Sequence, residues 1–319
     1  KDISFDAMIA IERYSAEYKN RWNEFVKMSK NGTFLFLRDY MDYHSDRFED
    51  CSLMIFRRGK LYALLPADVN GDTLRSYGGL TCGGLVMSEK ATTADIMAVL
   101  GLLNAYLKGM GVAKIIYKPV PYIYNRQPSE EDLYAIFNVC NARLTSRAVS
   151  SAIYKDCRNK WFRIRECGRK RAAADGIVIE RTDNPDDFWQ ILSDNLGRKY
   201  DTKPVHTVEE IRLLMRRFPD KIRLFLAKKD GVTLGGTLLY LTERVVHSQY
   251  ISASEEGKRL HALDLLFGCV IEEALREHDY FDFGISTEQN GTLLNEQLIY
   301  QKEGFGGRGV CYDCYEWTL

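Results

Sequence analysis

The sequence predicts an α/β protein, of the α+β type, built from two similar halves that each fold a mixed, mostly antiparallel sheet flanked by helices. Two observations support this. Strand-like and helix-like patterns follow the same order in both halves: three strands, a helix, a strand, a helix and a closing strand. A single register without gaps places Tyr117 on Phe283 and Tyr134 on Tyr300, which indicates an internal repeat.

The second half has the clearer turn signals between its predicted elements. The Asp230-Gly231 pair favours a tight hairpin between two apolar runs, and Glu243-Arg244 marks the next turn. Residues 260–277 place apolar side chains on one stripe at helical spacing. The strands are expected at 222–227, 234–241, 245–253, 280–285 and 309–317.

The first half repeats this order with weaker signals. Its strands are expected at 53–56, 61–67, 74–79, 114–119 and 142–155, and its helices at 94–108 and 130–137. The domains are therefore predicted at 1–155 and 156–319, joined by a basic helix at about 156–174. Arginine and lysine side chains surround Trp161 and Phe162 in that segment, which is either a solvated linker or a surface for an anionic substrate.

A motif near the end of the second half carries the most chemical information. Asn295 precedes Tyr300 by five residues on a short helix, and Gly304 can adopt the left-handed conformation that ends it before Phe305. This arrangement resembles the last helix of the GNAT acyltransferases, and the resemblance implies that Tyr300 protonates the leaving thiolate. The alternative is a half-buried tyrosine whose hydroxyl only packs.

Further matches extend over most of the chain and resemble the tandem-domain FemAB-like transferases. They are Trp22, Phe25, Ser29, residues 31–34, residues 77–80, residues 282–284 and residues 300–306. Relatives that use aminoacyl-tRNA often carry a long helical arm, and the sequence has no pattern for one. The resemblance therefore implies a GNAT acetyltransferase of the FemAB-like group, with two tandem GNAT-like domains.

The same resemblance implies that the donor is acyl-CoA, with acetyl-CoA favoured. Its expected contacts are the end of the third strand, the phosphate-binding turn and the motif helix: Ile251, Ser252, Ala253, Gly257, Lys258, Arg259 and Asn295. The turn departs from the family pattern, because it has one glycine and begins with Glu255 and Glu256, whose carboxylates would repel a pyrophosphate. This departure also fits an acyl donor other than CoA.

The acceptor side is less defined. Tyr77, Tyr250 and Glu288 are the expected substrate contacts, and a pocket is predicted between Ile251, Ser252, Gly257, Asn295 and Tyr300. Amine attack on a thioester needs a base. The candidates are His247, His261, Glu288 and Asp282, although Asp282 is expected mainly to fix the adjacent turn and a lone histidine is commonly structural.

Composition excludes several classes of protein. The 44 basic and 44 acidic side chains cancel, which argues against strong nonspecific binding to nucleic acid. No apolar run approaches the ~20 residues of a membrane span, and the scattered cysteines suit a reducing compartment, so a cytoplasmic protein without a metal is expected. The Cys311 and Cys314 pair lacks a partner pair for a metal site.

Together these observations predict an N-acyltransferase that moves an acyl group, with acetyl favoured, to an amine acceptor in a groove between the domains. The acceptor is a small molecule or a cell-envelope precursor. One alternative is an aminoacyl-tRNA-dependent transferase that acts on a peptidoglycan precursor. Another is a GNAT-fold binding module without catalysis.

Overall fold

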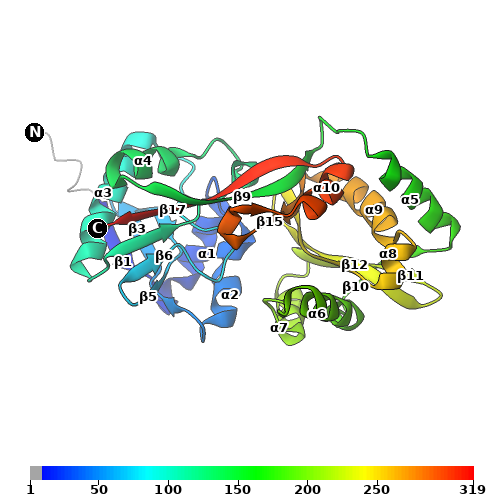
Figure 1. The fold of residues 1–319 in the computed structure, drawn as a ribbon. Coiled ribbons are helices and arrows are strands. Elements are labelled where there is room, and N and C mark those ends of the chain that lie inside the picture. The colour runs from blue at the N-terminus through cyan, green and yellow to red at the C-terminus, as the bar shows by residue number, and fades with distance from the viewer. Residues whose placement is uncertain (1–8) are drawn as a thin grey trace, which may run out of the picture. The chain divides into compact units, whose positions relative to one another are not determined.

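The protein, described by a computed structural model over residues 9–319, divides into two compact units (Figure 1). Unit 1 comprises residues 9–148, 289–292 and 311–319, and unit 2 comprises 149–288 and 293–310. The sequence predicted a boundary between residues 155 and 156. The division lies instead inside strand β9 (Arg143–Tyr154), because that strand begins in unit 1 and ends in unit 2.

Unit 1 contains two sheets. One has the order β1-β3-β4-β7, and the other continues from β9 through β17, β8, β6, β5 and β2. The strands are β1 (Ile9–Arg13), β2 (Glu49–Asp50), β3 (Leu53–Arg57), β4 (Lys60–Leu65), β5 (Asp68–Asn70), β6 (Thr73–Arg75), β7 (Val86–Met87), β8 (Lys114–Tyr117) and β17 (Arg308–Thr318). The helices are α1 (Lys19–Met28), α2 (Arg38–Met41), α3 (Thr93–Gly109) and α4 (Glu131–Cys140).

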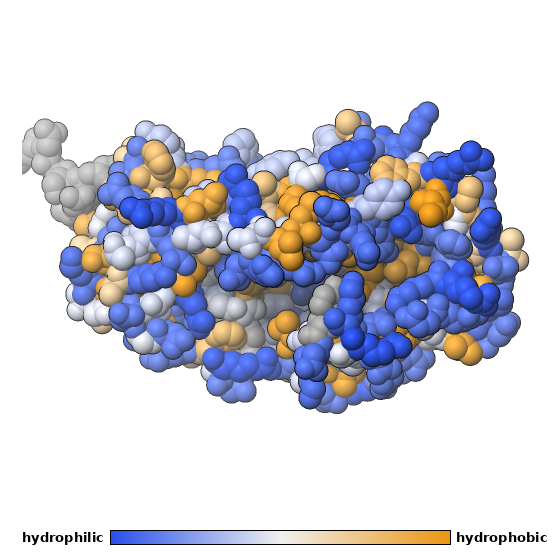
Figure 2. Space-filling model, viewed as in Figure 1, coloured by the Kyte–Doolittle hydropathy of each residue, from blue (hydrophilic) through white to orange (hydrophobic). Residues whose placement is uncertain are grey.

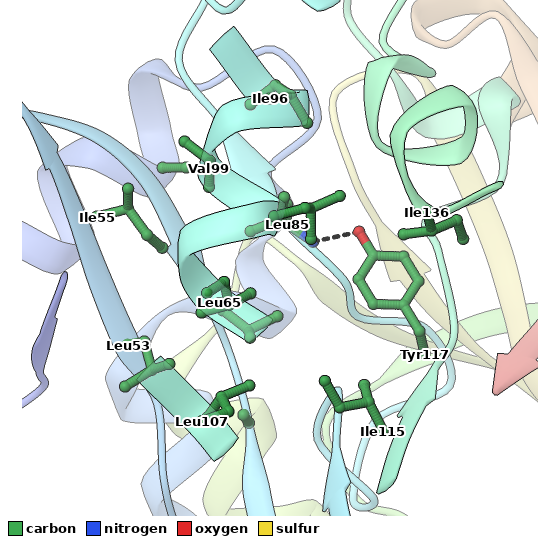
Figure 3. Packing of buried hydrophobic residues seen from close by; sticks show 14 of the residues in the cluster. Leu53, Ile55, Leu65, Leu85, Ile96, Val99, Leu107, Ile115, Tyr117 and Ile136 are labelled. Carbon is green, nitrogen blue, oxygen red and sulfur yellow. Dashed lines mark hydrogen bonds between the residues drawn. The ribbon is translucent and has the colours of Figure 1, made fainter. Parts of the chain in front are cut away.

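The core of unit 1 forms where α3 and α4 pack on these sheets (Figure 3). Tyr117 is fully buried there, and its hydroxyl accepts the Leu85 N–H at 2.7 Å and donates to Asp132 at 2.5 Å. Burial raises the pKa of Tyr117 well above its usual value and raises that of Asp132 to about 6. Trp317 from β17 belongs to the same core.

Unit 2 has one large sheet in the order β10-β11-β12-β13-β14-β9, and β15 and β16 form a separate two-stranded sheet. Neighbouring strands are antiparallel except β13 and β14, which run parallel, as β6 and β8 do in unit 1. The strands are β10 (Val178–Thr182), β11 (Ile222–Lys229), β12 (Val232–Leu241), β13 (Val245–Ala253), β14 (Tyr280–Ile285), β15 (Thr287–Glu288) and β16 (Leu293–Leu294). The helices are α5 (Arg163–Ala174), α6 (Asp186–Tyr200), α7 (Val208–Arg217), α8 (Glu255–Arg259), α9 (Ala262–Glu277) and α10 (Glu296–Gly304). The predicted fold class is confirmed.

Helices cover both faces of the unit 2 sheet. Apolar side chains of α9 pack with Val246, Phe281 and Phe283 on one face. On the other face, α6 places Phe188 against β12, close to Gly236. The outer surface over α6 and α7 is mainly hydrophilic (Figure 2), which agrees with helices that turn their apolar sides inward.

Two segments of unit 2 differ from the prediction. The helix expected over 260–277 begins at Ala262, because His261 takes a left-handed conformation, with φ of 57°, between α8 and α9. The basic segment is a structural part of unit 2 rather than a solvated linker. Its helix α5 packs against α9, and Arg165 pairs with the buried Asp264 at 3.0 Å. Over residues 9–319, no helix is long and apolar enough to cross a membrane.

Candidate functional site

The candidate site lies where strands β13 and β14 separate. Their parallel pairing covers three residue pairs and ends at His247 and Asp282. Beyond that pair, β13 continues to Ala253 and remains bonded to β12 on its other edge. A cavity of about 650 Å³ opens in unit 2 along this part of β13.

The cavity is bounded by both helix layers and by α10. Its lining includes Leu192, Asn195, Leu196, Arg198 and Lys199 of α6, Ile251, Ser252 and Ala253 of β13, Leu263 and Phe267 of α9, Phe283 of β14, and Leu298, Gln301, Lys302 and Phe305 at α10. Lys258 and Glu255 add one charge of each sign. Basic side chains therefore outnumber acidic ones in the lining, which suits a ligand that has an apolar part and an anionic part.

The end of β13 is fixed by helix α6. The Asn195 Nδ2 donates to Ser252 Oγ at 2.7 Å and to the Ala253 carbonyl at 2.8 Å. One side chain thus holds two of the three predicted donor-binding residues of this strand. Ile251, Ser252 and Ala253 all line the cavity.

The predicted phosphate-binding turn is occupied by the short helix α8. The Gly257 N–H donates to Ser254 Oγ at 3.0 Å, and the Lys258 N–H donates to the Ser254 carbonyl at 2.9 Å. A Cβ on Gly257 would lie 2.1 Å from the Leu234 carbonyl oxygen, so close packing on β12 explains this glycine. These two amides bind within the turn, and neither Gly257 nor Arg259 lines the cavity.

The charges of α8 are compensated locally. Lys258 pairs with Glu255 at 2.6 Å, and Arg259 pairs with Glu256 at 2.5 Å. These bonds lower the pKa of both glutamates. The two carboxylates therefore remain ionised, and the lysine and arginine offset their repulsion of an anionic donor.

Helix α10 turns a different face to the cavity from the one that the motif predicted. Leu298, Gln301, Lys302 and Phe305 form one flank, while Tyr300 lies on the opposite flank because each residue advances 100° around the helix. Tyr300 is 54% exposed, and its ring packs on Phe162 with centroids 5.1 Å apart. The structure thus does not bring Tyr300 to the cavity.

Asn295 also has a structural role. Its Oδ1 accepts the Leu298 N–H at 3.0 Å as the cap of α10, and its Nδ2 donates to Glu288 at 2.7 Å. Both residues lie outside the cavity lining. The predicted pocket therefore contains Ile251 and Ser252, but not Gly257, Asn295 or Tyr300 in its wall.

Lys302 is the site residue that the sequence analysis missed. Its side chain is buried, and its Nζ donates to the carbonyls of Gly284 and Ile285 at 2.8 Å each. Burial lowers the pKa of Lys302 to about 8, while the charge of Asp282 acts in the opposite direction. The available signal was its position four residues after Leu298 and three before Phe305, which places a lysine on an apolar flank.

The remaining predicted residues lie apart from the cavity wall. Tyr250 bonds His206 Nδ1 at 2.6 Å through its hydroxyl, and burial raises the pKa of Tyr250 to about 12. Tyr77 is buried in unit 1 and donates to the Met41 carbonyl at 3.2 Å. His261 lies 3.2 Å from Asp264. His247 lies at the point where β13 and β14 separate.

Comparisons with known proteins agree with this geometry. Residues 156–290 match the acetyltransferase (GNAT) domain family. FemX is 12% identical with a TM-score of 0.68, and the match covers 97% of each chain. A tandem GNAT protein from the clavulanic acid biosynthesis pathway is 14% identical with a TM-score of 0.54, covering 97% of this chain and 98% of its own.

A third solved structure is the C-terminal domain of a protein described as a lysylphosphatidylglycerol synthetase from Agrobacterium fabrum. It is 14% identical with a TM-score of 0.60, covering 94% of this chain and 91% of its own. A comparison with curated protein sequences finds no match. At these identities the structural likeness establishes the fold.

The fold and the family match define the class: residues 156–290 form a GNAT domain, and the chain has two such folds in tandem. Over nearly its whole length the chain is similar in fold to FemX and to the tandem GNAT protein.

Proposed function

We propose that the protein is an N-acyltransferase that binds its acyl donor in the unit 2 cavity, with acetyl-CoA as the favoured donor. The observation that carries this proposal is the cavity at the separation of β13 and β14, with Lys302 buried in its wall. Past His247, the edge of β13 that faces β14 is not paired with that strand, so it can bond the amide groups of a pantetheine arm as an added strand would.

Lys302 supplies the electrostatic part of the chemistry. Its ammonium group donates to the carbonyls of Gly284 and Ile285, which directly follow Phe283. Phe283 itself lines the cavity. A fixed positive charge in a desolvated wall stabilises the oxyanion that forms when an amine attacks the donor carbonyl. With a pKa of about 8, the same group can give a proton to the leaving thiolate near neutral pH.

A second candidate donor is an aminoacyl-tRNA, with a cell-envelope precursor as acceptor. It is favoured by α8, whose Gly257 and Lys258 amides bond within the turn rather than to a pyrophosphate. The basic lining also suits the phosphates of an RNA 3′ end. Both donors are cytoplasmic molecules, so we place the reaction in the cytoplasm.

Titration calorimetry separates the possibilities. The wild-type protein is titrated with acetyl-CoA, with CoA, and with a short RNA hairpin that ends in a stable aminoacyl analogue. Micromolar binding of acetyl-CoA that weakens in Asn195→Ala supports the first donor, because Asn195 fixes the β13 end. Binding of the RNA alone supports the second, and binding of neither refutes catalysis in favour of a binding module.

The roles of Lys302 and Tyr300 are tested with the donor that binds. Lys302→Met is expected to slow single-turnover transfer by about 10²-fold, the size typical of a lost oxyanion or acid group. Tyr300→Phe is expected to leave the rate unchanged, because its ring lies against Phe162. The reverse result would restore Tyr300 as the acid and remove Lys302 from the mechanism.

A further inference from the structure

We infer that His247, oriented by Asp282, is the general base that deprotonates the acceptor amine. This inference rests on the proposed function, because it assigns a residue for the same transfer reaction. The two residues form the last pair of the parallel β13 and β14 ladder, directly before the strands separate.

Asp282 is completely buried and fully engaged. It lies 2.9 Å from His247 Nδ1 through Oδ2, and its Oδ1 accepts the Gly284 N–H at 3.1 Å and the hydroxyl of Ser150. The bond to Gly284 is the turn-fixing role expected from the sequence. The bonds to Ser150 and His247 could not be expected, because they depend on the pairing of three strands.

These bonds determine which ring nitrogen is basic. A carboxylate that accepts the hydrogen bonds of Ser150 and Gly284 is stabilised in its ionised form, so the proton between it and His247 belongs to Nδ1. The lone pair is then on Nε2, as in other histidines oriented by a carboxylate. The ring also packs beside Gly284, where a Cβ would lie 3.4 Å from its Cε1.

The pair lies on the face of the sheet that α6 and α7 cover. Val246 and Phe281 pack on α9, so the alternation of side chains along a strand directs His247 and Asp282 to the face covered by α6 and α7. The cavity reaches that face through its α6 lining. The segment from Phe283 to Ile285 connects this pair to Lys302. Phe283 lines the cavity, and the carbonyls of Gly284 and Ile285 bind the Lys302 ammonium group.

Ionisable groups act on the imidazole or on its aspartate from three elements. Asp282 contacts it from β14, Tyr240 pairs opposite it on β12, and Lys302 acts on Asp282 from α10. Asp282 thus contacts His247 directly and also acts electrostatically on Lys302. A histidine oriented by a carboxylate through Nδ1 has Nε2 in position to act as the base.

The reaction moves the acyl group from sulfur to the acceptor nitrogen. His247 Nε2 takes a proton from the ammonium group of the acceptor, and the freed lone pair forms the new C–N bond. The carbonyl π pair moves to oxygen and then returns to re-form the C=O bond, and the C–S bonding pair leaves with the sulfur as the thiolate. The nitrogen loses its second proton; one of the two protons ends on the thiolate, and the other reaches solvent.

The test uses two amines that differ in protonation. Butylamine is an ammonium ion at neutral pH and needs a base, whereas hydroxylamine is largely unprotonated there and does not. His247→Asn retains an N–H near the Nδ1 position that can donate to Asp282 but has no basic nitrogen. With acetyl-CoA as donor, we expect this variant to slow transfer to butylamine by about 10²-fold and transfer to hydroxylamine by less than about threefold.

The chain offers a matched control. His261 also lies beside a buried aspartate, Asp264, but that pair is bound to Arg165 of α5 and does not line the cavity. His261→Asn is expected to leave both rates unchanged. Its native φ of 57° is a conformation that asparagine tolerates, so the control should fold.

Nitrogen-15 NMR of histidine-labelled protein gives a readout that needs no substrate. We expect wild-type His247 to show a protonated Nδ1 and an unprotonated Nε2 at neutral pH, and Asp282→Asn to lose this preference. Equal losses with both amines, no loss in either, or a wild-type ring protonated at Nε2 alone would overturn the inference. If the wild-type protein used no acyl donor, the proposed function would fail, and the NMR result would still decide the tautomer.

Discussion

Replacing Lys302 with methionine should change how the stability of the protein depends on pH. Burial lowers the pKa of Lys302 from 10.5 to about 8, so between these values the unfolded chain binds a proton that the folded protein does not. The free energy of unfolding must then rise with pH across this window. Below pH 8 both states are protonated, and the full cost of burying the charge remains.

The size of the change follows from the same values. The pKa of Lys302 falls from 10.5 to about 8, and each pKa unit corresponds to about 1.4 kcal/mol. As the pH rises through this window, the wild-type protein should therefore gain about 3 kcal/mol of stability relative to Lys302→Met. The variant also removes the donor of the Gly284 and Ile285 carbonyls, a pH-independent loss of about 1 kcal/mol for each bond. Near pH 7 the cost of burying the charge roughly offsets the two hydrogen bonds, so the two proteins should have similar stability. Near pH 10.5 the wild-type protein no longer bears that cost, so the free energy of unfolding of the variant should be lower by about 2 kcal/mol.

Chemical denaturation of both proteins at matched pH values measures this difference directly. Lys160→Met is the control, because Lys160 is exposed and its loss removes the same formal charge. The control should run parallel to the wild type across the window. A constant difference between wild type and Lys302→Met from pH 7 to about 10.5 would refute the burial of a titrating ammonium at this position.

Two other substitutions test the packing of each unit. Tyr117→Phe should lower the free energy of unfolding by about 2 kcal/mol in denaturation experiments, because it leaves the buried Asp132 and the Leu85 N–H without their shared hydroxyl; an unchanged midpoint would contradict this. Gly257→Ala should lower the melting temperature, since its Cβ would meet the Leu234 carbonyl, whereas Gly197→Ala, in an open helical position, should raise stability by about 0.5 kcal/mol. Equal effects of the two alanines would argue against close packing of α8 on β12.

The strands of unit 2 were predictable because their signals are local. The Asp230-Gly231 turn and the apolar runs on either side place β11 and β12 without knowledge of the fold. Helix α7 was not predicted, although its start carries a capping box between Thr207 and Glu210. Such a signature names a helix start but not the sheet face that the helix covers.

The site was predictable only in part, for physical reasons. The motif located α10, but which flank meets the cavity depends on packing against Phe162 and β14, and this decides between Tyr300 and Lys302. The His247 and Asp282 pair is 35 residues apart in sequence. It forms through the register of two parallel strands, which no local pattern specifies.

The sharing of β17 between the units has a consequence for biosynthesis. Trp317 fills the core of unit 1, yet it follows more than 140 residues of unit 2 along the chain. During synthesis, the first half of the chain therefore leaves the ribosome before the core of unit 1 is complete and before β17 has joined its sheet. Completion of the unit 1 core therefore depends on residues 311–319 and on long-range strand pairing, which forms slowly.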